Sequence, residues 1–113
     1  MNKLDITFSA LSDSTRRAIL AQLRAGEKSL SELAEPFNMT QSAVSKHVRV
    51  LTEAGLTTME KRGRTRHCSL NPMAMIDAAH WLDEYREMWM SSFENLGSYF
   101  AGIDIQNNDG NQN

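Results

Sequence analysis

The sequence predicts a mainly α-helical domain that carries one small β-hairpin. Through residues 4–54, and again after residue 71, apolar residues recur every three or four positions, which is the spacing of one face of an α-helix. Between these stretches, residues 56–62 and 65–70 form two short, alternating runs separated by Gly63-Arg64, the pattern of a hairpin. The chain has 113 residues, the size of one ordinary domain.

Two helices are predicted before residue 27. The first is short, with one apolar stripe at helical spacing made by Leu4, Phe8 and Leu11. Asp13 is a candidate N-cap for a second helix over residues 15–26, and the glycine at its end is a typical stop. The residues of this second helix that we expect to face the core are Ile19, Leu20 and Leu23.

A third and a fourth helix follow closely. Ser29 and Glu32 have the spacing of a capping box and predict a helix that runs to about Phe37. After a short turn, Thr40 is a candidate N-cap for a helix over residues 41–54. Two helices joined in this way form a helix-turn-helix, in which the second helix enters the major groove of DNA.

A long fifth helix is predicted from Pro72 to about Phe100. Asn71 is its candidate cap, and proline suits the first helical position. About 28 residues would make a rod about 40 Å long, longer than a small core needs, so we expect a second copy of the chain to bury part of it. Residues 101–113 are polar and predicted to be a disordered tail, which leaves residues 1–100 as one domain. The predicted fold class is therefore a winged helix-turn-helix of five helices plus a two-stranded wing, and dimeric.

The net charge of −2 conceals an uneven distribution. Residues 38–70 carry six Lys or Arg against two acids, whereas residues 71–113 carry one Arg against seven acids. A basic segment beside an acidic one is expected if the basic segment meets a polyanion such as double-stranded DNA. A solvated charged surface would have the same composition, so charge alone leaves both interpretations open.

The polar side of the helix over residues 41–54 has the chemistry of a surface that reads DNA. At about 100° per residue, Val44, Val48 and Leu51 fall on one side and should face the core. The other side presents short hydroxyls and cations, which can bond base acceptors or phosphates, although any amphipathic helix has a polar face. The candidate DNA-binding residues here are Gln41, Ser42, Ser45, Lys46, His47 and Arg49. For His47, at the boundary, packing is an equal alternative.

The hairpin adds four more candidate DNA-binding residues around the turn at Gly63. A basic wing tip can lie along the phosphate backbone or reach the minor groove, where arginine is favoured. The alternative is a sheet edge whose charges resist aggregation. These four residues are Lys61, Arg62, Arg64 and Arg66.

Other features of the sequence argue against several classes of protein. No apolar run is long enough to span a membrane, and the first twenty residues contain Asp5 and Asp13 and no uninterrupted apolar stretch, unlike a secretory signal. A lone Cys68 allows no internal disulfide and fits the cytoplasm; we expect it to be buried in a strand. No nucleophile elbow, phosphate-cradling glycine loop or metal cluster is present, so an enzyme is not expected.

Four motifs are spread along residues 4–100. They are Asp13 with Thr15-Arg16-Arg17 and Ile19-Leu20, then Ser31-Glu32-Leu33-Ala34, Val44-Ser45-Lys46-His47 and Ala54-Gly55-Leu56. With these motifs, residues 4–100 resemble the ArsR-type (arsenic-repressor-like) winged-helix regulators. The resemblance implies an obligate homodimer, with an interface formed by the first and last helices, that reads an inverted repeat and usually represses transcription. It also implies that Gln41, Ser42, Ser45, Lys46 and His47 contact DNA from the helix, and Arg64 and Arg66 from the wing.

The chain departs from the metal-sensing members of that family. Those members place cysteines on the third helix, where this chain has Leu33-Ala34-Glu35, or zinc ligands on the last helix at a spacing that Asp77-Ala78-Ala79-His80 does not match. The resemblance is thus closest to a metal-independent branch, and we expect no metal and no cofactor. His80 and Glu84, four residues apart, leave a metal-responsive derepressor as an alternative.

Two further alternatives remain open. An aromatic stripe on the last helix is a candidate site for a small-molecule effector, although core or dimer packing also explains it. A winged-helix module that binds proteins and never DNA is the other alternative. The stripe consists of Trp81, Tyr85, Trp89 and Phe93.

Overall fold

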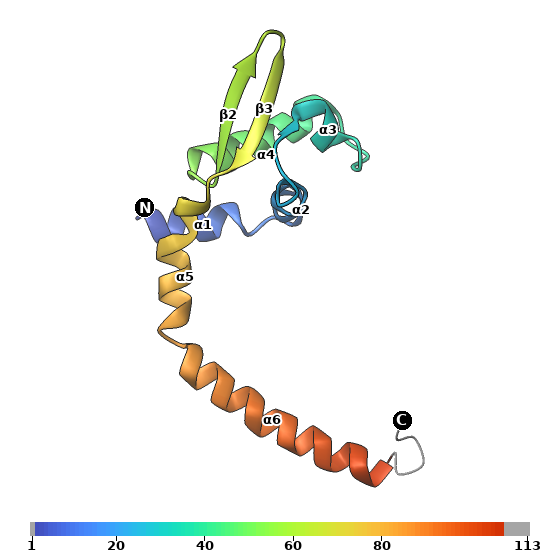
Figure 1. The fold of residues 1–113 in the computed structure, drawn as a ribbon, viewed down its shortest axis with the longest axis vertical. Helices are drawn as coiled ribbons and strands as arrows, with labels where there is room; N and C mark the ends of the chain where they lie inside the picture. Colours follow the sequence, from blue (N-terminus) through green and yellow to red (C-terminus); the bar gives the residue numbers. More distant parts are fainter. Residues whose placement is uncertain (1, 108–113) are drawn as a thin grey trace. The chain divides into compact units, whose positions relative to one another are not determined.

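The computed structural model describes residues 2–107 and confirms a mainly helical fold with a basic hairpin (Figure 1). The described residues divide into two compact units, which meet between Ala78 and Ala79. In chain order the elements are α1 (Lys3–Ala10), α2 (Ser14–Leu23), β1 (Lys28–Ser29), α3 (Leu30–Ala34), α4 (Gln41–Glu53), β2 (Thr57–Arg62), β3 (Thr65–Leu70), the 3₁₀ helix η1 (Pro72–Met75), α5 (Ile76–Asp83) and α6 (Arg86–Asn107).

The helix starts follow the capping residues that the sequence indicated. The Asp13 carboxylate accepts a hydrogen bond from Arg16 N at 3.0 Å, and the Thr40 hydroxyl accepts one from Ala43 N at 3.1 Å. Ser29 and Glu32 form both bonds of a capping box. Each bond satisfies a backbone N–H that the first turn of a helix leaves without a partner, so these short-range signals fix where α2, α3 and α4 begin.

The core of the first unit lies between α2, α3, α4 and the sheet. Ile19, Leu33, Val44 and Leu51 are completely buried. Val48, the third residue predicted to face inward from α4, is 2% exposed, which confirms the predicted orientation of that helix. From α2, Leu23 is buried as expected, whereas Leu20 is only partly buried against the core.

The sheet has one more strand than the sequence predicted. Its order is β1-β3-β2, antiparallel throughout, with Ser29 opposite His67 and Glu60 opposite His67 on the other side. The predicted hairpin is confirmed, and Gly63 takes a positive φ of 61° at its turn, a conformation that glycine adopts without steric cost. The strand β1 has two residues, too short to produce an alternating pattern.

The third helix is shorter than predicted. It ends at Ala34 rather than near Phe37, and the Phe37 backbone N–H donates to the Ala34 carbonyl in a four-residue turn. Pro36 explains the early end, because proline has no N–H to continue the helical ladder.

The long fifth helix was predicted incorrectly, because it consists of three pieces. It begins as η1, and it is interrupted between Asp83 and Arg86, where the Tyr85 amide bonds to the Leu82 carbonyl three residues back. Neither glycine nor proline marks this interruption. The last piece, α6, continues to Asn107, into the segment predicted as a tail; the rest of that segment, residues 108–113, lies outside the described residues.

Asn71 does not cap the helix that follows it, contrary to the prediction. No side-chain capping bond is formed at η1. Instead the Asn71 side-chain amide donates to the Gly55 carbonyl at 3.0 Å, and the Asn71 backbone N–H donates to the Leu56 carbonyl at 2.9 Å. Asn71 therefore connects the end of β3 to the end of α4.

Within the described residues, no helix is long and apolar enough to cross a membrane.

Two substitutions on one helix test this packing. Val44→Ala removes two buried methyl groups and should lower the free energy of unfolding by about 2 kcal/mol. Val50→Ala, the same substitution at a side chain that is 39% exposed, should change it by less than about 0.5 kcal/mol. Urea denaturation followed by circular dichroism measures both, and equal losses would contradict the orientation of α4.

Candidate nucleic-acid interface

The polar side of α4 is open to solvent. Gln41, Ser42, Lys46 and Arg49 are exposed, and Ser45 is half-buried. Because Val44, Val48 and Leu51 hold the opposite side in the core, these polar side chains point away from the protein as a set. This side of α4 has the donors and cations that major-groove contacts require.

A groove joins the start of α4 to the tip of the hairpin. Its volume is about 420 Å³. A second groove of about 310 Å³ runs between α4 and β2 and shares Ser45 and Arg66 with the first; it also contains Arg49 and Lys61. The first groove is lined by Leu30, Ser31, Gln41, Ser42, Ser45, Arg64, Thr65 and Arg66. Residues predicted separately on α4 and on the wing thus meet in one surface.

Two hydroxyl residues in the first groove were not among the sequence-based candidates. Ser31 comes from α3 and Thr65 from β3. Only the folded arrangement brings the start of α3 beside the hairpin, and no local sequence signal marks either residue.

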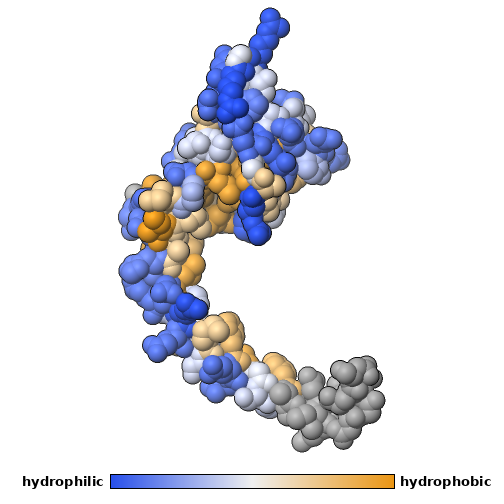
Figure 2. Space-filling model, in the orientation of Figure 1, coloured by the Kyte–Doolittle hydropathy of each residue, from blue (hydrophilic) through white to orange (hydrophobic). Residues whose placement is uncertain are grey.

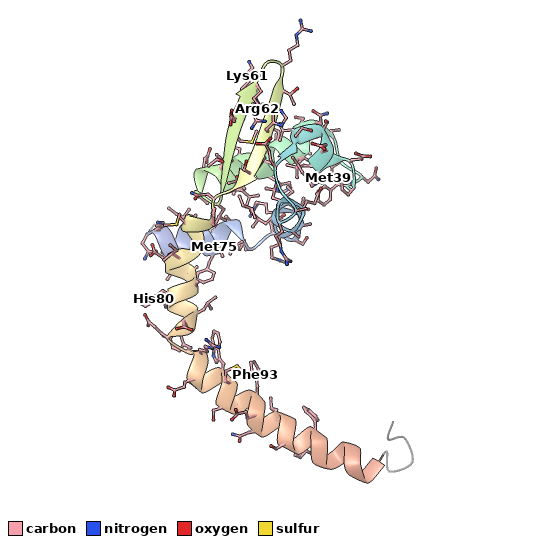
Figure 3. All side chains as sticks on the ribbon, in the orientation of Figure 1. Met39, Lys61, Arg62, Met75, His80 and Phe93 are labelled. Carbon is pink, nitrogen blue, oxygen red and sulfur yellow. The ribbon has the colours of Figure 1, made fainter. Side chains whose placement is uncertain are left out.

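The four wing cations lie on different parts of the hairpin. Lys61 is paired with Arg66 across the strands, and Met59 with buried Cys68, so these side chains share the face that turns toward α4, because residues directly opposite each other project to the same side of a sheet. Glu60 and Arg62 alternate with them and project from the other face. Arg64 is in the turn. Figure 3 labels Lys61 and Arg62 as neighbours on β2.

Arg62 is engaged by two carboxylates. Its Nη1 and Nη2 atoms donate to the two oxygens of Glu27 at 2.8 and 2.6 Å, and its Nε donates to Glu60 at 3.2 Å. The hydrogen bonds to Glu60 and Glu27 raise the pKa of Arg62 above its ordinary value, and the bond from Arg62 lowers the pKa of Glu60. The positive charge of Arg62 is therefore balanced by neighbouring carboxylates. The other three wing cations form no ion pair with the described residues.

His47 is directed away from the two grooves. Its Nδ1 lies 3.7 Å from the Asp13 carboxylate and 3.5 Å from Arg16 Nη1, and its side chain is 24% exposed. The backbone hydrogen bond from Arg16, with a smaller contribution from His47, lowers the pKa of Asp13. Arg16 also donates to the Ala10 carbonyl at 2.7 Å, so this cluster joins the end of α1, the start of α2 and α4.

Potential metal ligands do not converge among residues 2–100, the part of the chain whose side chains the structure describes. No group of three His, Cys, Asp or Glu side chains in this part of the chain could hold a metal ion. His80 and Glu84 are 3.9 Å apart and both well exposed. Cys68 is buried as predicted, and burial raises the pKa of its thiol, which disfavours the thiolate that soft metals need.

The fold and this surface define a helix-turn-helix DNA-binding transcriptional regulator. A helix-turn-helix domain model matches residues 11–60. The transcriptional repressor SdpR of Bacillus subtilis is 33% identical over 75 residues, which cover 66% of this chain and 83% of that protein. The arsenical resistance operon repressor of Escherichia coli is 30% identical over 101 residues, covering 88% of this chain and 84% of that one.

Solved structures agree with these sequence relatives. The crystal structure of an ArsR family transcriptional regulator superposes with a TM-score of 0.72 at 37% identity, covering 79% of this chain and 98% of that one. The structure of a possible transcriptional regulator for arsenical resistance has a TM-score of 0.67 at 33% identity, with 87% and 95% coverage. This chain belongs to the ArsR family of winged helix-turn-helix regulators.

The arrangement of cations predicts how one substitution changes DNA binding. Arg64→Ala should weaken binding to specific and random duplexes alike, and should reduce the slope of log affinity against log salt by about one unit, because one phosphate contact is lost. Fluorescence anisotropy titrations at several salt concentrations measure both quantities. Arg24→Ala, which removes an exposed cation at the end of α2, is the matched control and should leave the slope unchanged. Equal slopes for Arg64→Ala and wild type would exclude the wing tip from the interface.

Proposed function

We propose that this protein is a transcriptional repressor that binds an inverted-repeat operator as a homodimer. The observation that carries the proposal is the groove in which Gln41, Ser42 and Ser45 of α4 face Arg64 and Arg66 of the hairpin. Hydroxyl and amide groups can read base edges in the major groove, while the arginines bind phosphate or the minor groove. Lys46 and Arg49 extend this contact surface along α4.

His47 and Arg62 have smaller roles in this proposal than the sequence indicated. The contacts of His47 with Asp13 and Arg16 support a role in holding α4 in place. The carboxylates on Arg62 oppose its use as a phosphate contact. The proposed direct contacts are thus Gln41, Ser42, Ser45, Lys46, Arg49, Lys61, Arg64 and Arg66.

The second unit supports the dimer. Every described side chain from Trp81 to Phe100 is exposed, and Figure 2 shows apolar patches between polar ones along this part of the chain. Tyr85 and Trp89 stack with ring centroids 6.0 Å apart, and Trp89, Phe93 and Leu96 follow at helical spacing. A monomer rarely exposes so long an apolar stripe, which marks an interaction surface. A two-fold dimer would place its two copies of α4, the proposed recognition helices, about 34 Å apart, which is one turn of DNA.

We further propose that no metal or metalloid ion controls this repressor, although some of its relatives are named for arsenical resistance. Tight sites for transition metals need three or four ligands in fixed geometry. One buried cysteine and an exposed His80–Glu84 pair do not supply them. The candidate site for an effector is then the aromatic stripe on α5 and α6, and the effector would be an organic molecule.

Selection of bound fragments from genomic DNA tests the proposal directly. The purified chain should enrich a sequence with two-fold symmetry and half-sites about one helical turn apart. Anisotropy on that fragment should give a binding curve for one dimer per site. Enrichment of a sequence without symmetry, or no enrichment above random DNA, would contradict the proposed mode of binding.

The dimer predicts opposite results for two substitutions on α6. Phe93→Glu places a charge within the apolar stripe and should shift sedimentation at micromolar concentration from dimer to monomer, with loss of operator binding. Phe93 projects from α6 in Figure 3 and is 61% exposed in the single chain. Ser91→Glu adds the same charge on the other side of α6 and should remain dimeric. A dimer with Phe93→Glu that binds its operator like wild type would contradict this interface.

Metal independence predicts an unchanged operator affinity. Addition of EDTA, or of zinc, copper or arsenite at micromolar concentration, should alter the dissociation constant by less than about twofold, equivalent to about 0.4 kcal/mol. A tenfold loss with zinc that His80→Ala abolishes would contradict the prediction and identify α5 as the metal site. Glu84→Gln then provides an independent check of the second ligand.

A further inference from the structure

The face of the sheet that carries Glu60 and Arg62 holds a connected charge cluster. Glu27 receives two hydrogen bonds from Arg62, at 2.6 and 2.8 Å, and lies 3.5 Å from His67 Nδ1. Glu60 binds the same guanidinium at 3.2 Å. The cluster thus joins the residue that precedes β1 to side chains of both wing strands.

The strand register shows that this cluster extends from the turn of the hairpin toward its base. Because β1 runs antiparallel to β3, with Lys28 opposite Cys68 and Ser29 opposite His67, the chain before Lys28 runs toward the base of the hairpin. Arg62 is opposite Thr65, next to the turn. Its side chain therefore reaches back along the sheet, across His67, to meet Glu27, and the contact joins the outer wing to the base of the domain.

The outer wing, residues 61–66, makes few other contacts with the rest of the domain. The strand β1 pairs only with His67 and Cys68, so residues 61–66 form a two-stranded ribbon whose side chains are all exposed. Isolated two-stranded hairpins are marginally stable in water. A bidentate contact between arginine and carboxylate fixes an orientation more strongly than a single charge pair does.

We propose that Glu27 and Arg62 form a clamp that positions the wing against α4, so that Arg64 and Arg66 are held ready for DNA. This inference rests on the proposed function, because it assumes that the wing contacts the duplex. Arg62 is a positioning residue here and makes no direct contact. Exposed ion pairs add little to global stability, so loss of the clamp should loosen the wing without unfolding the domain.

The first experiment measures the clamp in the free protein. Glu27→Gln should speed hydrogen exchange of the Arg62 and Thr65 amides, which pair across the wing next to its turn, by about tenfold, with an unchanged midpoint of urea unfolding. Glu35→Gln, which removes another exposed carboxylate at the end of α3, is the matched control and should leave these amides as in wild type. Wild-type exchange in Glu27→Gln would overturn the clamp, whatever the DNA results.

The second experiment uses the sign of the effect on DNA binding. Removal of a carboxylate near a surface that binds a polyanion should strengthen binding by electrostatics alone. Loss of the clamp predicts the reverse for Glu27→Gln, a loss of about three- to tenfold because the wing must be ordered on binding, with the salt slope unchanged. Glu35→Gln should bind as tightly as wild type or more tightly. Tighter binding by Glu27→Gln would overturn the proposal.

Two substitutions of Arg62 separate positioning from direct contact. Lysine keeps the charge for a phosphate but cannot make the bidentate bond to Glu27, so Arg62→Lys should lose as much affinity as Arg62→Gln, and adding Glu27→Gln to either should cost nothing more. Full affinity in Arg62→Lys, with a slope reduced by one unit in Arg62→Gln, would identify Arg62 as a direct contact and overturn the clamp. If exchange speeds up as expected but Arg64→Ala leaves DNA binding unchanged, the clamp stands and the proposed role of the wing fails.

Discussion

Burial of one side of α4 is the constraint on which the exposed surface depends. Val44, Val48 and Leu51 are in contact with the core and almost inaccessible to solvent, and successive residues of a helix are rotated by about 100°. The roll of α4 about its own axis is therefore fixed, and Ser42, Lys46 and Arg49 must project outward. A rotation by a single residue would expose valine and bury a cation. The free-energy penalty of burying that charge exceeds the stabilisation that any contact on the outer side provides.

The same logic of periodicity divides the hairpin. Lys61 and Arg62 are adjacent on β2, so they cannot project from the same face. One of them turns toward α4 with Arg66, and the other toward Glu27 and Glu60. Of the four wing cations, Arg62 is thus already paired with carboxylates in the fold. Alternation was readable in the sequence, but the partner of Arg62 was not, because Glu27 is 35 residues away along the chain.

Short-range signals predicted the helix starts and the hairpin, because capping and turn chemistry act within about four residues. Ser29 with Glu32, and Gly63 in the turn, are examples. The two-residue strand β1 escaped prediction because its only cause is its pairing with β3. The interruption before Arg86 escaped for a different reason: the apolar spacing continues through it, and no residue there disfavours the helix. On the polar side of α4, the chemistry of each residue was predictable but its neighbours were not. The sequence left packing and DNA contact as equal alternatives for His47, and in the fold it lies beside Asp13 and Arg16.

Arg16 connects α1 to α4 in this architecture. Arg16 donates to the carbonyls of Ser9 and Ala10 at the end of α1, and its guanidinium also approaches His47 on α4. A shift of α1 would therefore displace the Arg16 guanidinium from His47 on α4, the helix that we propose contacts DNA. If α1 belongs to the dimer interface, as the family resemblance implies, then the geometry of the dimer and the pose of each recognition helix are not independent. A ligand that binds the aromatic stripe would need only to favour one arrangement of the two copies to change operator affinity, because an effector acts through the difference in its affinity for the two states.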